Sequence, residues 1–190
     1  MSQKPQLTIL GCGVLGRAIV DGLLSGVSQE YRIALTHRRS DAAKALQVDF
    51  PGAVVSTDNK DARIWSGTVS RHIVLIGAQP RYTVDVCRDI SAAVAVLEQQ
   101  RQKTPLTVVT VCPGITVAEL ASWLPAGTPI VRSMPNTPIS VGQGATAIFA
   151  SASTPADTVS ELLVIFRLMS PVVTVLPREE LMDAVASVSG

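Results

Sequence analysis

The stretch GCGVLG, residues 11–16, constrains the fold of this chain more than any other part of the sequence. It follows the apolar run LTIL (Leu7–Leu10) and precedes Val14–Leu24, whose apolar residues recur at the period of one helix face. The three glycines suit a tight turn, a close approach of pyrophosphate to the backbone, and close packing of helix on strand. A strand, this loop and a helix therefore predict a dinucleotide site at a helix N-terminus. The alternative is a glycine turn with a structural role alone.

The rest of the chain alternates short apolar runs with helical patterns, and this alternation predicts the fold class. Strands are expected at Leu7–Leu10, Arg32–Thr36, Ala53–Ser56, His72–Gly77, Leu106–Val111, Pro129–Met134, Ala145–Ala150 and Pro171–Leu176. Helices are expected at Val14–Leu24, Asp41–Val48, Tyr82–Gln102, Val117–Trp123 and Ala156–Met169. The inner strands are apolar on both faces, which indicates an α/β fold of Rossmann type, with a mostly parallel sheet covered by helices on both faces.

The last residues, 178–190, predict the start of a C-terminal helix. Their first turn is acidic, and apolar residues then form a stripe at Leu181, Ala184, Val185 and Val188. We therefore expect a dinucleotide-binding domain at residues 1–177 and the start of a helical segment at 178–190. The helical pattern still continues at Gly190. We therefore expect the apolar face of this helix to pack against a further part of the protein, a second copy in a homodimer, or another partner.

Composition excludes several classes of function. The net charge is +1 and aromatic residues make up 4%, which argues against a nucleic-acid-binding surface. The cysteines, Cys12, Cys87 and Cys112, lack the spacing of metal ligands, so no metal site is expected. The chain shows neither a signal peptide nor an apolar run of roughly 18 residues. The expected location is therefore the cytoplasm, without attachment to a membrane.

The segment HRRS, residues 37–40, predicts which dinucleotide binds. NAD-binding folds usually carry an acidic residue at the end of the second strand, where it holds the ribose hydroxyls. This chain has His37, Arg38 and Arg39 there, and guanidinium groups suit the 2′-phosphate of NADP(H). We expect NADP(H) as the cofactor, with Arg38 as the main contact and Arg39 as the one that points away. The alternative is that one or both arginines are solvated surface charges.

Four later segments together resemble the pyrroline-5-carboxylate reductases. VRSMPNTPISVGQGATAIFA (residues 131–150) resembles the stretch that marks this family, with its Pro-Asn-Thr-Pro and Val-Gly-x-Gly-Ala-Thr motifs. VVTVCPGITVAELASWL (108–124) resembles the strand, loop and short helix that precede it, and STDN (56–59) the loop whose asparagine reaches the cofactor. VLIGAQP (74–80) is similar to the family's strand ending in Ala-Val-Lys-Pro. The resemblance extends from about Leu7 to Ser189.

The resemblance implies an NADPH-dependent oxidoreductase that reduces a small-molecule imine, 1-pyrroline-5-carboxylate, to L-proline in proline biosynthesis. The protein would supply positioning and electrostatics while the cofactor supplies the hydride. The implied substrate-facing, catalytic wall is Met134, Asn136 and Thr137, stiffened by neighbouring prolines. The implied cofactor-binding residues are Leu10, Gly11, Cys12, Gly13, Val14, Leu15, Gly16, His37, Arg38, Arg39, Asn59, Gly77, Ala78, Gln79, Pro80, Val111, Cys112, Pro113 and Gly114. His72 opens a strand, and a structural role is expected for it.

The chain departs from the family pattern at two positions and at its end. Gln79 stands where the family has lysine, which removes a cation, and Pro113 removes a backbone donor beside the nicotinamide site. DAVASVSG (183–190) resembles the start of the family's helical domain, which forms the dimer and holds the substrate carboxylate, and that domain is expected to be missing or truncated here. Two alternatives therefore stay open: a non-catalytic NADP(H)-binding module, and a divergent imine or ketone reductase.

Overall fold

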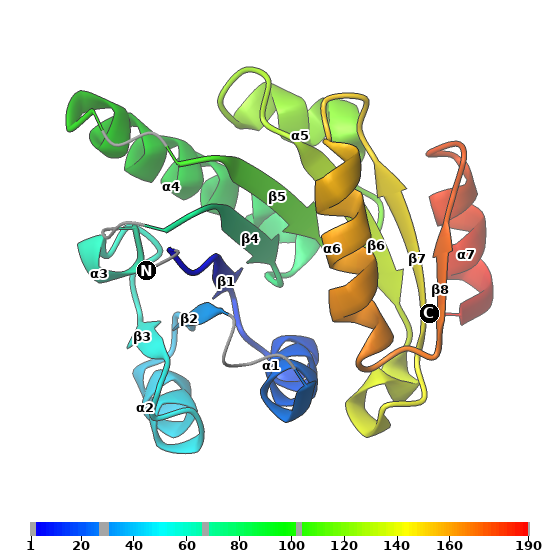
Figure 1. The fold of residues 1–190 in the computed structure, drawn as a ribbon, viewed down its shortest axis with the longest axis horizontal. Helices are drawn as coiled ribbons and strands as arrows, with labels where there is room; N and C mark the ends of the chain where they lie inside the picture. Colours follow the sequence, from blue (N-terminus) through cyan, green and yellow to red (C-terminus); the bar gives the residue numbers. More distant parts are fainter. Residues whose placement is uncertain (1–2, 27–30, 66–68, 102–103, 190) are drawn as a thin grey trace.

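The computed structural model describes residues 3–26, 31–65, 69–101 and 104–189, in which strands and helices alternate (Figure 1). The strands are β1 (Gln6–Leu10), β2 (Arg32–Thr36), β3 (Val54–Ser56), β4 (His72–Ile76), β5 (Leu106–Thr110), β6 (Ile130–Pro135), β7 (Ala145–Ala150) and β8 (Val172–Val175). The α-helices are α1 (Val14–Gly26), α2 (Ser40–Asp49), α3 (Ala62–Trp65), α4 (Pro80–Gln99), α5 (Val117–Trp123), α6 (Ala156–Arg167) and α7 (Leu181–Ser189). A 3-10 helix, η2, spans Thr137–Val141.

The strands form one sheet in the order β3-β2-β1-β4-β5-β6-β7-β8. β1 is central and pairs in parallel with both neighbours, so that Leu7 lies opposite Ile33 on β2 and Ile73 on β4. Neighbouring strands are parallel throughout, apart from the antiparallel pair β6–β7. The carboxyl ends of β1, β2, β4, β5 and β6 therefore share one edge, where α/β sheets bind their ligands.

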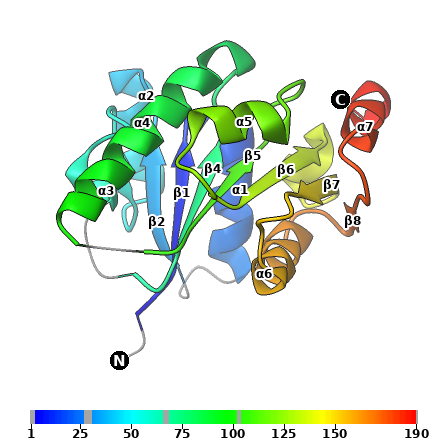
Figure 2. The same ribbon diagram turned by 90° about the horizontal axis from the view of Figure 1, so that it is seen from above.

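Helices cover both faces of the sheet, because the inner strands are apolar on both sides. On one face the strands pack against α1 and α6, through residues such as Ile19 and Leu162. On the other face they pack against α4 and α5, through residues such as Ile90 and Leu120. Figure 2 shows α4 and α5 on one side of the sheet and α1 and α6 on the other. The predicted α/β architecture of Rossmann type is confirmed.

The predicted elements and the observed ones differ mainly at their ends. Helix α4 starts at Pro80, two residues before the predicted Tyr82, because proline suits the first position of a helix. The predicted end of that helix, Gln102, lies outside the described residues, as does Gly190. Strand β6 extends to Pro135, where it pairs with Thr146 of β7. Two short elements, α3 and η2, were not predicted, because four or five residues are too few to show a helical period.

Helix α7 packs on the sheet rather than standing apart from it. Met182 is fully buried and forms a small apolar cluster with Met134 of β6 and Ala147 of β7. The start of the C-terminal segment is therefore anchored to the antiparallel strand pair β6–β7. A division of the chain after residue 177 stays a prediction.

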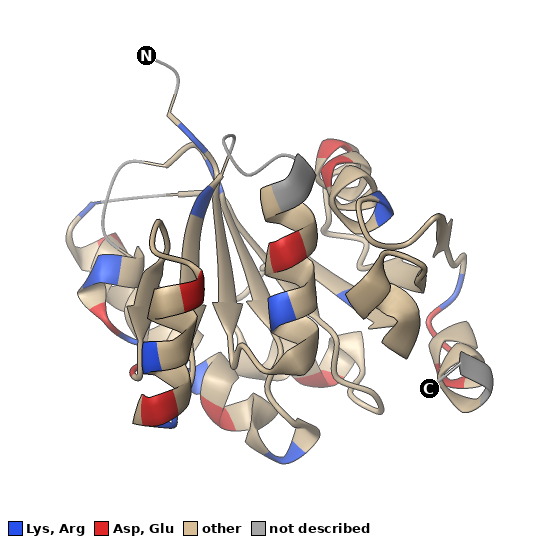
Figure 3. Ribbon diagram, turned by 90° about the horizontal axis from the view of Figure 1, so that it is seen from below, with Lys and Arg blue, Asp and Glu red and all other residues tan. Residues whose placement is uncertain are grey.

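Basic and acidic residues are nearly equal in number, and neither sign dominates the view in Figure 3. Basic and acidic residues are interspersed along the helices rather than separated onto two faces (Figure 3). Within the described part of the chain, no helix combines the length and the apolar character that crossing a membrane requires.

Candidate functional site

Two of the three glycines in the GCGVLG stretch, Gly11 in the loop after β1 and Gly16 in α1, leave little room for a larger residue. Gly11 has φ +82°, and a Cβ atom added there would lie 2.9 Å from the backbone nitrogen of Ala78, which follows β4. A Cβ atom at Gly16 would lie 3.1 Å from side-chain atoms of Ile9 and Cys12. The predicted tight turn and the predicted close packing of α1 on β1 both agree with this geometry.

Gly13 differs, because open space surrounds it. A Cβ atom added at this glycine would meet no heavy atom within 4 Å. The backbone of the loop is therefore accessible at the position where the motif predicts a pyrophosphate.

The first turn of α1 offers backbone N–H groups to this open space. Arg17 donates its N–H to the carbonyl oxygen of Gly13 at 2.9 Å, so the helical hydrogen bonds begin there. The N–H groups of Val14, Leu15 and Gly16 precede that bond and have no partner within the helix, as in any first turn. No acidic residue stands in the first turn of α1, so the positive end of the helix dipole is not neutralised. These groups fit a diphosphate.

A cavity of about 380 Å³ lies at this edge of the sheet, beside the glycine loop. The residues that line it come from the loops after β1, β2, β3 and β4 and from the start of α4. They are Gly11, Gly13, Thr36, His37, Arg38, Arg39, Thr57, Asn59, Gly77, Ala78, Gln79, Tyr82, Asp85, Val86 and Asp89. Much of the predicted cofactor-binding set is therefore brought together around one cavity.

The two arginines after β2 have different surroundings. Arg39 pairs with Asp41, with Nε 3.1 Å from Oδ1, and this hydrogen bonding lowers the pKa of Asp41 to about 2. Its backbone N–H also donates to Nδ1 of His37 at 3.1 Å. The Arg38 guanidinium instead lies 4.5 Å from the centre of the Tyr82 ring, and no carboxylate pairs with it among the described residues. The charge available to a phosphate is thus that of Arg38.

Asn59 lies in the cavity wall, and its amide already has partners. Its Oδ1 accepts a hydrogen bond from Oγ1 of Thr36 at 2.7 Å, and its Nδ2 donates to Asp89 at 3.0 Å. Thr36 also accepts the N–H of Gly11 at 3.1 Å, which connects the ends of β1 and β2. A bond from Asn59 to a cofactor would replace one of these contacts, and the role of Asn59 stays a prediction.

The loop after β4 closes the cavity on the side predicted for the nicotinamide. A Cβ atom at Gly77 would lie 2.9 Å from the carbonyl oxygen of Gly11, so these two loops touch through their backbones. The Cys112 thiol donates to the carbonyl oxygen of Ala78 at 2.7 Å and holds the loop against the end of β5. Gln79 is exposed at the start of α4 and lines the cavity, as predicted.

Other predicted cofactor residues lie near the cavity without lining it. Leu10, Cys12, Val111 and Cys112 are buried in the core, so a cofactor role for them would go through the backbone. Burial raises the pKa of the Cys12 thiol to about 12, which keeps it protonated. Val14, Pro80, Pro113 and Gly114 are exposed, and Leu15 is half-buried in α1.

The predicted substrate wall stands at the carboxyl end of β6, on the same edge of the sheet. Met134 is buried against Met182 of α7. The Asn136 Oδ1 accepts the N–H of Ala145 at 2.8 Å, and Thr137 is exposed at the start of η2. None of these three residues is among those that line the cavity of about 380 Å³, so their contact with a substrate stays a prediction.

Tyr82 is the main cavity residue that sequence reasoning missed. It is half-buried on the first turn of α4, beside Arg38 and Arg81. The pKa of its hydroxyl is lowered, first by a hydrogen bond with Arg38 and then by the charges of Arg38 and Arg81. Its place two residues after Pro80, at the end of the predicted nicotinamide-side segment, was the signal available in the sequence.

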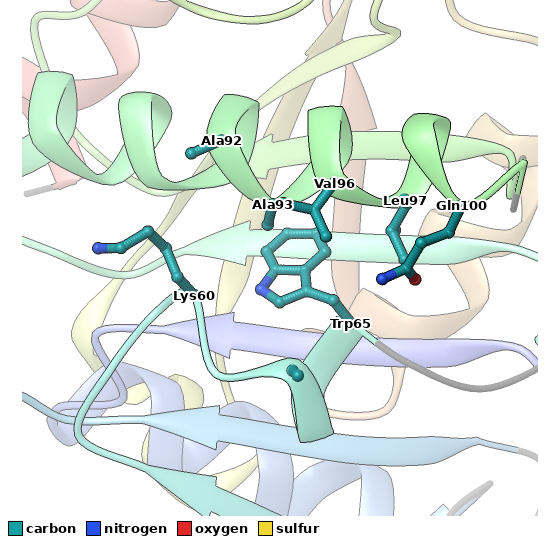
Figure 4. A pocket seen from close by; sticks show the side chains of 8 residues that line it. Lys60, Trp65, Ala92, Ala93, Val96, Leu97 and Gln100 are labelled. Carbon is teal, nitrogen blue, oxygen red and sulfur yellow. The ribbon is translucent and has the colours of Figure 1, made fainter.

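A second cavity, of about 150 Å³, lies between α3 and α4 and has a different character. Figure 4 shows the Trp65 indole beneath α4, facing Ala93 and Val96. Its one cationic lining residue, Lys60, pairs with Asp89 at 2.8 Å. The cavity therefore lacks the unpaired charge and the open glycine backbone of the first one.

His72 lies away from the cavity of about 380 Å³, at the start of β4. The His72 Nε2 lies 2.7 Å from Oγ1 of Thr8 and 3.1 Å from Nε2 of Gln6, in a buried polar cluster. This position agrees with the predicted structural role. In the segments that the structure describes, no three His, Cys, Asp or Glu side chains gather as a metal site would require.

The chain resembles curated pyrroline-5-carboxylate reductases in sequence, and its fold resembles those of both pyrroline-5-carboxylate reductases and dehydrogenases. No family model matches the chain. It is 40% identical over 190 residues to Delta-1-pyrroline-5-carboxylate reductase apf3 of Gibberella fujikuroi, covering 96% of this chain and 63% of that protein. A pyrroline-5-carboxylate reductase from Coxiella burnetii has a TM-score of 0.80 and 26% identity, covering 100% of this chain and 64% of that one.

A more distant structure has the same fold. The Plasmodium falciparum pyrroline carboxylate reductase with NADP bound has a TM-score of 0.74 at 17% identity, over 100% of this chain and 64% of that one. The chain therefore spans a little under two thirds of the length of the relatives it matches. By sequence and by fold, the chain is a homologue of the pyrroline-5-carboxylate reductases.

Proposed function

We propose that this chain forms the NADP(H)-binding part of an imine reductase of the pyrroline-5-carboxylate reductase type. The observation that carries the proposal is the cavity of about 380 Å³, which joins an open glycine backbone at Gly13 to Arg38, an arginine that pairs with no carboxylate in the described segments. The NADP bound to the Plasmodium falciparum relative supports the same cofactor.

The described residues suggest how such a nucleotide would be held. The N–H groups of Val14, Leu15 and Gly16 would donate to the diphosphate at the positive end of α1. Arg38 would pair with a 2′-phosphate through charge-assisted hydrogen bonds. The tight contact between Gly11 and Ala78 keeps both loops close, so the nicotinamide end would lie against the loop after β4.

When bound, the reduced nicotinamide would supply a hydride to the carbon of a protonated imine, C=NH⁺, which becomes an amine while the nicotinamide is oxidised. The protein's part is then to position the two molecules and to exclude water. Met134, Asn136 and Thr137 are proposed to face the substrate, because they stand at the carboxyl end of β6 on the edge that holds the cavity. This wall favours a reductase over a module that only binds the nucleotide, which has no need of one.

The proposed substrate is a cyclic imine, 1-pyrroline-5-carboxylate, and the proposed location is the cytoplasm. The name of the fungal relative supports the substrate, and the three free cysteines agree with a reducing compartment. We further propose that α7 is where a second copy or another partner joins, and light scattering of the purified chain at several concentrations tests that.

The function is tested by titrating the chain with NADPH and NADH, and then by following NADPH consumption with 1-pyrroline-5-carboxylate. We expect NADPH to bind more tightly than NADH. Turnover by this chain would support the reductase directly, and turnover only by a longer form would assign residues 1–190 to the cofactor part. NADPH binding with no turnover by either would favour the non-catalytic module. No binding of NADPH at millimolar concentration would contradict the proposal.

A further inference from the structure

We propose that Arg81 and Tyr82, at the start of α4, complete a 2′-phosphate site with Arg38 and set the preference of this chain for NADP(H) over NAD(H). The inference rests on the proposed function. It adds two residues from a different element, α4, to the single arginine that the end of β2 provides. Arg38 and Arg81 would contact the phosphate, and Tyr82 would position both guanidinium groups.

The geometry that suggests this site is the contact of two arginines with one aromatic ring. The guanidinium carbons of Arg38 and Arg81 lie 4.5 Å and 4.8 Å from the centre of the Tyr82 ring, within the range of cation–π attraction. Arg38 and Tyr82 both line the cavity beside the glycine loop. The ring thus contacts two guanidinium groups at this corner: that of Arg38, which lines the cavity, and that of Arg81, which is not among the lining residues.

Other charged groups in the same wall are already neutralised. Arg39 is paired with Asp41. Asp85 lies 3.2 Å from Arg88, and the other acidic residue of the wall, Asp89, is paired with a lysine. No ion pair of Arg38 or Arg81 is found among residues 3–26, 31–65, 69–101 and 104–189. The corner therefore carries an excess of positive charge.

The position of Arg81 works against the local stability of α4. It stands in the first turn, where the helix dipole is positive and disfavours a cation, and no acidic residue offsets it there. Arg38 beside the same ring adds repulsion between like charges. Residues that destabilise the local structure in this way are expected at binding sites, where a ligand compensates the cost. A bound anion would offset both the unfavourable position of Arg81 and the repulsion between the two arginines.

A phosphate monoester matches the excess charge. It carries about 1.5 to 2 negative charges near pH 7, so one guanidinium neutralises only part of it and two neutralise it fully. Guanidinium groups bind phosphate oxygens with two parallel hydrogen bonds, and the Tyr82 hydroxyl can donate a further one. NAD(H) has no phosphate at this position, so it would leave the repulsion in place.

The test compares the dissociation constants of NADPH and NADH for the full chain and for four variants. Arg81→Gln should weaken NADPH binding about tenfold and leave NADH binding nearly unchanged, because a charge-assisted contact is lost. Tyr82→Leu should also reduce the preference for NADPH, and Tyr82→Phe should retain most of it, since the ring remains. Arg167→Gln is the control: this exposed arginine ends α6, which covers the opposite face of the sheet from α4, so its loss should leave the NADPH/NADH ratio unchanged.

The outcomes separate this inference from the proposed function. If the unmodified chain does not prefer NADPH, the cofactor assignment itself fails. If it prefers NADPH and Arg81→Gln and Tyr82→Leu keep that preference, only the role of α4 is overturned. An equal loss for Arg81→Gln and Arg167→Gln would mean that general charge, and not this corner, attracts the nucleotide. Arg81 is exposed, so its substitution leaves the core intact.

Discussion

Nη1 of Arg132 lies 2.8 Å from Oε1 of Glu179, and the same carboxylate oxygen accepts the N–H of Val117 at 2.7 Å. Arg132 is on β6 with 2% of its side chain exposed, while Glu179 precedes α7 and Val117 begins α5. One carboxylate therefore joins β6 to the starts of both α5 and α7. The pair also fixes where α7 begins relative to β6.

Removing this carboxylate should destabilise the fold. Glu179→Ala leaves the buried Arg132 charge without its closest partner, and we expect a loss of about 3 kcal/mol in the free energy of unfolding. Urea denaturation followed by circular dichroism measures it. The neighbouring exposed residue provides the control, since Glu180→Ala should change stability by less than about 0.5 kcal/mol. Similar losses for both variants would show that the buried ion pair contributes nothing specific.

Gly11 and Gly13 should respond oppositely to the same substitution. Gly11→Ala introduces a Cβ at φ +82° and 2.9 Å from the backbone of Ala78, so we expect it to destabilise the fold by about 1–3 kcal/mol. Gly13→Ala meets no atom of the protein within 4 Å, so the stability should stay nearly the same. Its methyl group would instead enter the space predicted for the pyrophosphate and weaken NADPH binding. Thermal unfolding and NADPH titration of both variants separate the two effects, and normal NADPH affinity in Gly13→Ala would place the nucleotide elsewhere.

Arg38 and Arg39 form a matched pair for testing the cofactor preference. Arg38→Asp should weaken NADPH binding by about two orders of magnitude, because it removes a phosphate partner and adds repulsion, and it should affect NADH far less. Arg39→Gln should change both affinities only slightly, since Asp41 already neutralises Arg39. Titration calorimetry with each nucleotide measures the difference. Equal weakening of NADPH and NADH by Arg38→Asp would mean that this arginine does not contact the phosphate.

His72 should make the fold sensitive to acid. Burial, with a smaller effect of the Arg32 charge, lowers the pKa of His72 to about 4, below its usual value of about 6.5 in an unfolded chain. Between these two values the unfolded chain binds the extra proton and the folded chain does not. Stability is therefore full above about pH 6.5 and falls as the pH drops towards 4, by up to about 3 kcal/mol.

The histidine's share of this acid sensitivity can be isolated by substitution. Urea midpoints at pH 7, 6 and 5 should fall for the unmodified chain and change less for His72→Gln. The Asp41 carboxyl titrates at about 2, outside this range, so it does not mimic the effect. Parallel pH dependences in the two proteins would rule out His72 as the source.

Much of the architecture could be predicted from the sequence, because it depends on neighbouring residues. The alternation of apolar runs with helical periods predicted a mostly parallel sheet, and strands such as Arg32–Thr36 and Ala145–Ala150 were predicted with their observed bounds. The glycine spacing predicted a turn between β1 and α1, since backbone conformation and Cβ clashes are local properties. Short elements such as α3 escaped prediction because they lack a full helical period.

The sequence by itself determined the fold class, the phosphate-binding turn and the presence of two arginines after β2. Only the tertiary structure decided which charges are available. It paired Arg39 with Asp41 and left Arg38 on the Tyr82 ring, and it buried Arg132 against Glu179, 47 positions along the chain. Local patterns encode helices and strands through periodicity. The neutralisation or exposure of a charge depends instead on residues that folding brings together from distant parts of the chain, and no local pattern records them.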